Sequence, residues 1–325
     1  MRSPLRFRPY LRPMVWGGRQ LGQTLGKSLP TGEGYGESWE VSDHPTHRSV
    51  AADGSTLRGL MESAAKALLG ADREQFPWLV KYLDARDWLS VQVHPDEGAV
   101  QWLLPGENSK TEAWFILAAE PGSRVYAGLR PGVDEARLRR AVEDGTVARC
   151  LHSFEPRAGQ CVFLPAGTVH AVGGGVLIAE VQQTSDATFR LFDWNRLGPG
   201  GEMRPLHLEE AIASIHWTAG PVEPVRVEGY PDGGPSWQEL VRCRFFHLDY
   251  VRQREAFCLP AGRMQVVMVL HGEGELLGEG GRERLVAGDT LLLPATMPVA
   301  RVLPRGGLGL LLASLPEAAE GRRAA

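Results

Sequence analysis

Short apolar runs separated by glycine and proline predict a chain built mainly from β-strands. The runs are rich in β-branched, aromatic and aliphatic side chains, and many of the 39 glycines and 23 prolines lie between them. The expected strands are Trp88–His94, Ala113–Ala119, Gln160–Leu164, Gly175–Gln182, Thr188–Trp194, Phe245–Val251, Val266–Leu270, Glu273–Leu277, Thr290–Leu293 and Leu308–Ala313.

Helical periodicity is confined to three segments. In Ser55–Gly70, apolar residues recur on one face of a helix, with Ser55 as the candidate cap and Gly70 as the stop. Asp134–Ala148 begins with an acidic turn, and Leu208–Ile215 is the third segment. We therefore expect a mainly β fold with a few short helices.

A stretch rich in proline, glycine and charge, residues 218–237, predicts a linker between an N-terminal part (1–217) and a smaller β part (238–325). A weak internal repeat relates the two parts, because Gly159 and Pro165 recur with the same spacing as Gly288 and Pro294. In the second copy Thr296 replaces Gly167 and Val299 replaces His170. This predicts two related β-barrels, of which the first binds a metal and the second is degenerate and binds none.

Composition excludes several classes of partner. The net charge of −4 favours neither nucleic acid nor an anionic membrane. No run approaches the ~18 apolar residues of a membrane span, and no apolar run follows the arginine-rich start. The cysteines form no CxxC pair, so reduced thiols in a cytoplasmic protein are expected. The sequence leaves open whether the chain is a monomer or a homodimer.

Gln92 and His94 are the first candidate metal ligands. In a strand they share one face, while Val91 and Val93 share the other. Inside a barrel such polar groups need partners, and a metal ion is one. Taken alone, the pattern is more typical of a hydrogen-bonded core histidine beside an ordinary glutamine.

Glu112 and His170 extend the candidate metal site. Glu112 opens an apolar run that predicts a strand buried on both faces, where a carboxylate needs a partner, although it is also compatible with a solvated strand end. His170 follows a Pro165–Gly167 turn, where many histidines are simply exposed. Taken together, two histidines, one glutamate and an amide form a mixed nitrogen and oxygen set with room for substrate. Zn²⁺ fits this set best, and Mn, Co or Fe would accept the same ligands.

These segments resemble a known family. The pattern from Gly159 to His170 matches the second motif of the cupin superfamily, which implies cupin-type, jelly-roll-like β-barrels. The chain is more narrowly similar to type I mannose-6-phosphate isomerases of the short bacterial kind. The similar stretches are Trp16–Gly18, Gly36–Ser42, Phe76–Lys81, Leu89–Asp96, Lys110–Trp114, Pro165–Ala171 and Glu180–Asp193.

The resemblance implies an activity and a set of residue roles. It implies interconversion of mannose 6-phosphate and fructose 6-phosphate through an enediol, with His94, Glu112 and His170 as zinc ligands and Gln92 as an additional one. It also implies that Arg190 is catalytic, whereas the residues alone allow Arg190 to pair with Asp186 or Asp193 at a sheet edge.

Two lysines are further candidates for binding a sugar phosphate. Lys110 lies two residues before Glu112, so we expect it to bind phosphate or to shuttle a proton; Lys81 is a weaker phosphate candidate. No residue stands out as the proton-transferring base. The competing functions are a non-catalytic sugar-phosphate-binding or regulatory cupin, which the presence of Arg190 and Lys110 argues against, and a metal-dependent dioxygenase, which the glutamate and glutamine ligands disfavour.

Overall fold

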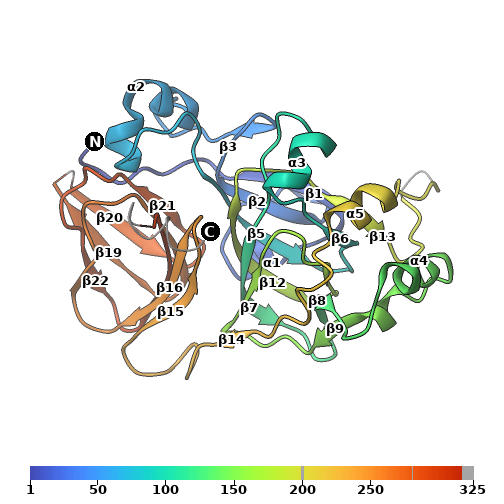
Figure 1. Ribbon diagram of the computed structural model, residues 1–325. Helices are drawn as coiled ribbons and strands as arrows, with labels where there is room; N and C mark the ends of the chain where they lie inside the picture. Colours follow the sequence, from blue (N-terminus) through green and yellow to red (C-terminus); the bar gives the residue numbers. More distant parts are fainter. Residues whose placement is uncertain (199–200, 280, 317–325) are drawn as a thin grey trace.

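The computed structural model describes residues 1–198, 201–279 and 281–316, and its strands form two facing pairs of sheets (Figure 1). The first pair comprises a seven-stranded and a five-stranded sheet. In spatial order, the seven-stranded sheet contains β1 (Tyr10–Gly18), β2 (Tyr35–Val41), β5 (Trp78–Ala85), β12 (Val176–Gln183), β7 (Glu112–Ala119), β10 (Gln160–Leu164) and β14 (Val225–Arg226). The five-stranded sheet contains β13 (Phe189–Phe192), β6 (Val91–Val93), β11 (His170–Val172), β8 (Val125–Leu129) and β9 (Leu151–Phe154).

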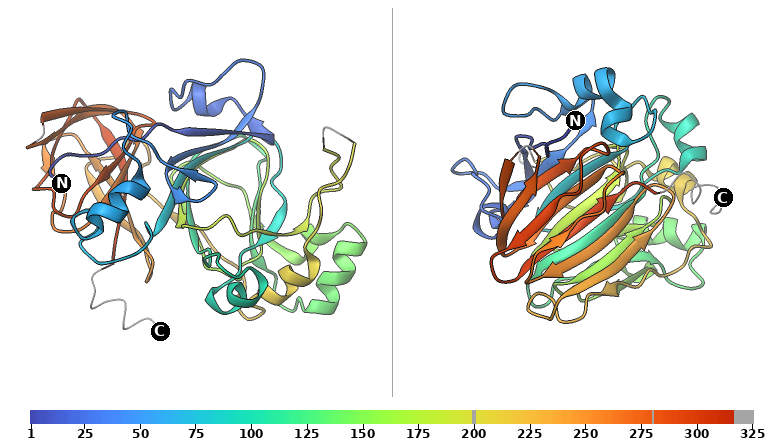
Figure 2. Two further views of the ribbon diagram at one scale, coloured as in Figure 1. Left: turned by 90° about the horizontal axis from the view of Figure 1, so that it is seen from above. Right: turned by 90° about the vertical axis from the view of Figure 1, so that its left-hand side faces the viewer.

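The second pair of sheets is built from the C-terminal part of the chain, drawn orange to red in Figure 1 and seen face-on in the right view of Figure 2. One sheet has the order β15 (Ser236–Arg242), β16 (His247–Gln253), β23 (Leu308–Ser314), β18 (Gln265–His271) and β21 (Thr290–Leu293). The other has the order β17 (Phe257–Cys258), β22 (Arg301–Pro304), β19 (Glu273–Gly278) and β20 (Gly281–Val286). A separate ribbon pairs β3 (Asp43–His44) with β4 (His47–Arg48). The prediction of a mainly β fold with two barrel-like units is confirmed.

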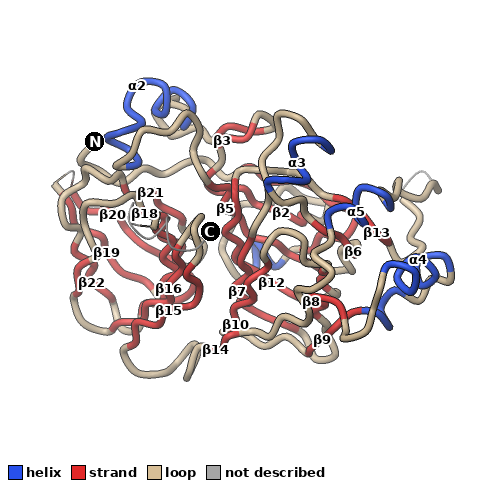
Figure 3. Tube along the Cα trace, viewed as in Figure 1, coloured by secondary structure: helices blue, strands red, loops and turns tan. Residues whose placement is uncertain are grey.

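Helices are few, short and peripheral (Figure 3). They are α1 (Gln20–Gln23), α2 (Leu57–Leu69), α3 (Glu97–Leu103), α4 (Glu135–Glu143), α5 (Leu208–Ser214) and the 3₁₀ turn η1 (Val147–Cys150). The cap of α2 is Thr56 rather than the expected Ser55, because the Thr56 hydroxyl accepts from the Gly59 amide. The helix predicted over Asp134–Ala148 ends early, at Glu143, before the left-handed Gly145.

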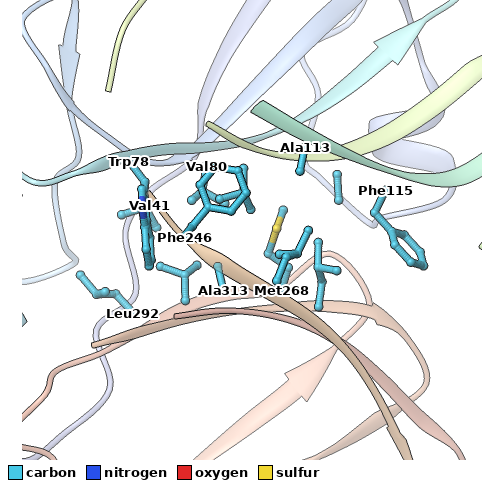
Figure 4. Packing of buried hydrophobic residues seen from close by; sticks show 14 of the residues in the cluster. Val41, Trp78, Val80, Ala113, Phe115, Phe246, Met268, Leu292 and Ala313 are labelled. Carbon is cyan, nitrogen blue, oxygen red and sulfur yellow. The ribbon is translucent and has the colours of Figure 1, made fainter. Parts of the chain in front are cut away.

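The seven-stranded sheet is buried on both faces. Alternate residues such as Leu83 and Ile116 point into the first barrel, whereas Val80 and Phe115 pack against the C-terminal sheet. Figure 4 shows this second layer, where Val80 and Phe115 face Met268 and Ala313. Two buried faces explain why these strands appear in the sequence as nearly continuous apolar runs.

Phe246 lies at the centre of this inter-sheet layer and is fully buried (Figure 4). Phe246→Ala is expected to lower the free energy of unfolding by about 3–5 kcal/mol, because it leaves a cavity that rigid strands fill poorly. Phe257→Ala, on the rim of the C-terminal sheets, is the control and should cost less because Phe257 is partly exposed. Denaturant titration measures both, and equal losses would contradict a tightly packed layer.

The predicted domain boundaries stay a prediction. The segment expected to be a linker contributes β14, which pairs with β10, and the N-terminal residues cross to the other unit, where Leu5 bridges Leu292. Helix α2 also contacts the C-terminal unit, since the Ala295 amide donates to the Leu68 carbonyl at 2.8 Å. Aliphatic side chains fill the C-terminal barrel, among them Val267, Leu291 and Leu312.

Candidate functional site: a buried metal-ligand group

Three side chains of the types that bind metals, each at or next to the end of a different strand, meet in the first barrel. His94 follows β6, Glu112 begins β7 and His170 begins β11, and one ligand atom from each lies within 4.8 Å of the others. The Glu112 carboxylate lies between the two imidazoles, with Oε2 3.4 Å from His94 Nε2 and Oε1 3.3 Å from His170 Nε2. All three side chains are buried. In the described part of the chain, this is the one group of this kind.

The turn before β11 fixes the position of His170 relative to His94. Gly167 adopts a φ of +83°, and its amide donates to the His94 carbonyl at 2.8 Å. A Cβ at this position would also lie 2.4 Å from the His216 ring. Glycine therefore allows the turn to approach both neighbours, and the turn sets the two imidazoles side by side.

Backbone carbonyls orient both rings. His94 Nδ1 donates to the Ala187 carbonyl and His170 Nδ1 donates to the Thr168 carbonyl, both at 2.8 Å. These bonds place the proton on Nδ1 and leave the Nε2 lone pair directed at Glu112. His94 Nε2 and Glu112 Oε1 are buried and lack a hydrogen-bond partner among the described residues. Buried atoms of this kind call for a partner, and a divalent cation is one that both accept.

Burial and charge set the protonation states that a metal requires. Burial lowers the pKa of His94 to about 3 and also lowers the pKa of His170, so both imidazoles are neutral at pH 7. Burial by itself would raise the pKa of Glu112, but the neighbouring Lys110 ammonium opposes it, and that pKa lies well below its usual range. The group thus presents two neutral nitrogens and one carboxylate.

Gln92 lies beside this group without contacting all of it. In the strand register Gln92 is opposite His170 on one side and Arg190 on the other. Its Nε2 is 3.3 Å from His170 Nε2, and its Oε1 accepts from Ser90 at 3.4 Å. A role as the fourth ligand requires the amide to turn over so that its oxygen faces the histidines.

A cavity of about 270 Å³ opens onto Glu112 and Gln92 and carries both signs of charge. Arg12, Lys81, Lys110, Arg190 and Arg204 line it, together with Glu37, Glu112, Glu180 and Asp186. Lys110 is buried, with Nζ 3.3 Å from Glu112 Oε2. A cavity of this polarity fits a small charged molecule with several hydroxyl groups.

Glu180 is the functional candidate that sequence reasoning missed. It is buried on β12, its register partner is Lys81, and its Oε1 lies 3.4 Å from Lys81 Nζ. Burial raises the pKa of Glu180 to about 7, although the neighbouring Lys81 opposes that rise. A carboxyl group titrating near neutrality beside a metal-ligand group is suited to accept and return a proton.

Arg190 enters the cavity from β13. Its Nη1 donates to the Pro205 carbonyl at 2.8 Å, and its buried Nε lacks a hydrogen-bond partner among the described residues. Asp186 and Asp193, the alternative partners weighed from the sequence, instead pair with Arg12 and with Arg196 and Arg204. The seven sequence-predicted site residues therefore lie together: His94 and His170 in the ligand group, and Gln92, Glu112, Lys110, Lys81 and Arg190 along the cavity.

In sequence, the chain is similar to mannose-6-phosphate isomerases. Residues 5–118 match a family model described as the catalytic domain of phosphomannose isomerase type I. A mannose-6-phosphate isomerase of Streptococcus mutans is 33% identical over 303 residues, covering 91% of this chain and 94% of that protein. Mannose-6-phosphate isomerase ManA of Bacillus subtilis is 30% identical over 313 residues, covering 90% and 93%.

Solved structures show the same fold. The crystal structure of a Bacillus subtilis mannose 6-phosphate isomerase superposes with a TM-score of 0.84 at 28% identity, covering 96% of this chain and 99% of that one. A mannose 6-phosphate isomerase bound with zinc and yttrium superposes with a TM-score of 0.73 at 18% identity, which shows the fold alone. In the described residues of the present structure, each helix is too short or too polar to cross a membrane.

Proposed function

The chain belongs to the family of type I mannose-6-phosphate isomerases, metal-dependent enzymes that interconvert mannose 6-phosphate and fructose 6-phosphate, and we propose that His94, Glu112 and His170 hold the metal of that reaction. The observation that carries the proposal is the convergence of ligand atoms from these three side chains within 4.8 Å of one another, beside a charged cavity that Glu112 lines. The relationship favours a catalytic protein over a sugar-binding or regulatory one.

We propose zinc as the metal. Two neutral imidazoles and one carboxylate are a set that zinc enzymes use while keeping a position open for substrate or water. A divalent cation held here supplies Lewis-acid stabilisation of the negative charge that develops on the sugar oxygens. Mn, Co and Fe accept the same donors, so elemental analysis of protein purified without added metal is the test. About one zinc per chain supports the proposal, and one equivalent of another metal contradicts it.

Moving a proton between C1 and C2 through the enediol requires a base beside the cavity. Glu180 lines the cavity and is buried. Its carboxylate form takes the proton from one carbon and its acid form returns it to the other. Lys81, 3.4 Å away, holds the side chain in place and stabilises the charged form.

Arg190 and Lys110 are the proposed cationic partners of the substrate. Lys110 is anchored beside Glu112, where it can donate to a sugar oxygen, and Arg190 brings a fixed guanidinium to the other side of Gln92. An arginine keeps its proton at any working pH, so the charge it offers is constant. The cavity, about 270 Å³, is of the size expected for one hexose phosphate.

Arg190→Ala is expected to retain the metal but to lose turnover of mannose 6-phosphate by about 100-fold or more, as expected for a preorganised donor that stabilises developing charge. Following fructose 6-phosphate formation with metal-loaded protein measures the rate. Arg130→Ala is a matched control, since Arg130 lies outside the cavity and bonds the Leu151 carbonyl. Unchanged activity in the Arg190 variant would remove this residue from the mechanism.

We also propose that the enzyme works in the cytoplasm. Its four cysteines are free, and two of them, Cys150 and Cys161, are buried, which suits a reducing compartment.

A further inference from the structure

The chain returns to the cavity immediately after β13. Asp193 follows Phe192, the last residue of that strand, and Leu197 forms a bridge with Met203. Arg204 bonds to Asp193 and lines the cavity, and the His207 amide donates to the Arg190 carbonyl at 2.8 Å. Arg190 and Arg204 therefore both line the cavity, and together they form its arginine rim.

Asp193 bonds to two arginines, one before and one after the Leu197–Met203 bridge. It is buried, and its two oxygens accept from Arg204 at 2.7 and 2.5 Å and from Arg196 at 2.7 Å. The two arginines differ in where they lie. Arg204 lines the cavity, whereas Arg196 turns away and donates to the Trp88 carbonyl at 2.7 Å.

The charges around the cavity are unevenly balanced. Three of its cations have a carboxylate partner that also lines the cavity: Arg12 with Glu37 at 3.0 Å, Lys81 with Glu180 at 3.4 Å and Lys110 with Glu112 at 3.3 Å. Arg190 and Arg204 differ from these three cations. Among the described residues, the side chain of Arg190 donates to a backbone carbonyl, and Arg204 pairs with Asp193, which lies outside the cavity. The positive charge of these two arginines therefore faces the cavity without an opposing carboxylate inside it.

Two like charges held together favour an anion between them. Burial, and then the charge of Arg204, lowers the pKa of the Arg190 guanidinium, which stays protonated because arginine ionises far above neutrality. Arg196 and Arg204 share Asp193, and Arg196 also pairs with Asp87 at 3.4 Å, so Arg190, Arg196 and Arg204 together face two carboxylates and keep an excess of positive charge. Guanidinium groups bind phosphate through paired, parallel hydrogen bonds.

The strand order places this rim at a suitable distance from the metal ligands. Arg190 is opposite Gln92 on β6, and Gln92 is opposite His170 on β11. Neighbouring strands are about 4.8 Å apart, so the backbones of Arg190 and His170 are separated by roughly 10 Å. A hexose with C1 and C2 at the ligand group has its phosphate at the far end of its carbon chain, which points toward the Arg190 and Arg204 rim.

We propose that Arg204, held by Asp193 and next to Arg190, binds the substrate phosphate at the rim of the cavity and thereby selects phosphorylated over free sugar. The proposal rests on the proposed function for the position of the sugar. It assigns Arg204 to substrate binding and Asp193 to positioning Arg204. Lys81 and Lys110 each have a carboxylate partner inside the cavity, Glu180 and Glu112, so the phosphate is assigned to Arg204 rather than to either lysine.

The test compares Arg204→Ala with Arg196→Ala in metal-loaded protein. Each variant removes one arginine from the same aspartate, but only Arg204 lines the cavity. Arg204→Ala is expected to raise the KM for mannose 6-phosphate by about 10- to 100-fold, the loss typical of one charge-assisted interaction, with kcat changed much less. The inhibition constant of inorganic phosphate should rise in parallel. Arg196→Ala should leave both constants within about 3-fold.

Arg204→Lys distinguishes loss of the subsite from a folding defect, because lysine keeps the charge beside Asp193 but lacks the planar guanidinium. The KM of Arg204→Lys should lie between those of the wild type and Arg204→Ala. Equal effects of Arg204→Ala and Arg196→Ala, or an unchanged phosphate inhibition constant in Arg204→Ala, would overturn the proposal. Calorimetric titration with inorganic phosphate separates it from the isomerase assignment. Phosphate binding that disappears in Arg204→Ala supports the subsite even if the wild type fails to turn over mannose 6-phosphate.

Discussion

His170→Ala is expected to abolish metal binding and to reduce isomerase turnover by about 1000-fold or more. The substitution removes one of three ligands, and the buried carboxylate of Glu112 then faces a single imidazole. Lewis-acid stabilisation is worth several kcal/mol, and each 1.36 kcal/mol corresponds to a tenfold change in rate. Metal content by elemental analysis and initial rates with mannose 6-phosphate measure the two effects.

His152→Ala serves as the control for His170→Ala. His152 also lies on the five-stranded sheet, but it pairs with the exposed Glu223 and lies outside the cavity. The control should keep full metal content and activity. If His170→Ala retained one metal per chain with near-normal turnover, the metal would have to bind elsewhere, and the proposed ligand group would be wrong.

Glu180→Gln is expected to lower kcat by about 100- to 10,000-fold while leaving metal content unchanged. The amide has nearly the same shape and can bond to Lys81, but it cannot accept the proton that moves between C1 and C2. In the wild type, kcat should rise with pH along the acidic limb of its profile, because burial raises the pKa of Glu180 and the ionised form is the acceptor. The working form is lost as pH falls through that pKa.

Two results would count against Glu180 as the base. A Gln variant with wild-type kcat would exclude proton transfer by this group. A Gln variant that lost its metal would instead indicate a structural role beside Glu112. Leu83→Ala, which alters the same cavity wall without touching a titratable group, is the matched control and should change kcat much less.

Strand prediction worked best where turns were marked on both sides. Gln160–Leu164 and Thr290–Leu293 were predicted to the residue, since each lies between a positive-φ glycine and a proline. Trp88–His94 was predicted too long, because the ladder with its neighbours covers Val91–Val93. Helix α3 was missed, since seven residues are too few to display a helical period.

The proposed metal ligands could be selected from the sequence because they belong to local motifs. Each of His94, Glu112 and His170 stands next to a residue pattern that marks a strand end or turn, so a single sequence carries the signal. Glu180 gave no such signal on its own. The available clue was a carboxylate inside the apolar run Val176–Val181, and its meaning depends on the register with Lys81, which sequence alone does not reveal.

The position of Arg204 at the cavity could not be predicted from the sequence for a similar reason. It lies in an irregular segment, and its place at the cavity follows from Asp193, eleven residues earlier, rather than from a periodic pattern. That both faces of the seven-stranded sheet are buried was partly predictable, since the run after Glu112 was expected to be buried on both faces. What covers the second face, the C-terminal sheet, required the fold.

Anomalous diffraction from crystals of active enzyme, recorded on both sides of the zinc absorption edge, is the most direct test of the central claim. The expected result is one zinc peak within bonding distance of His94 Nε2, His170 Nε2 and a Glu112 oxygen. A fully active crystal with its metal peak away from these three atoms, or with none at all, would contradict it.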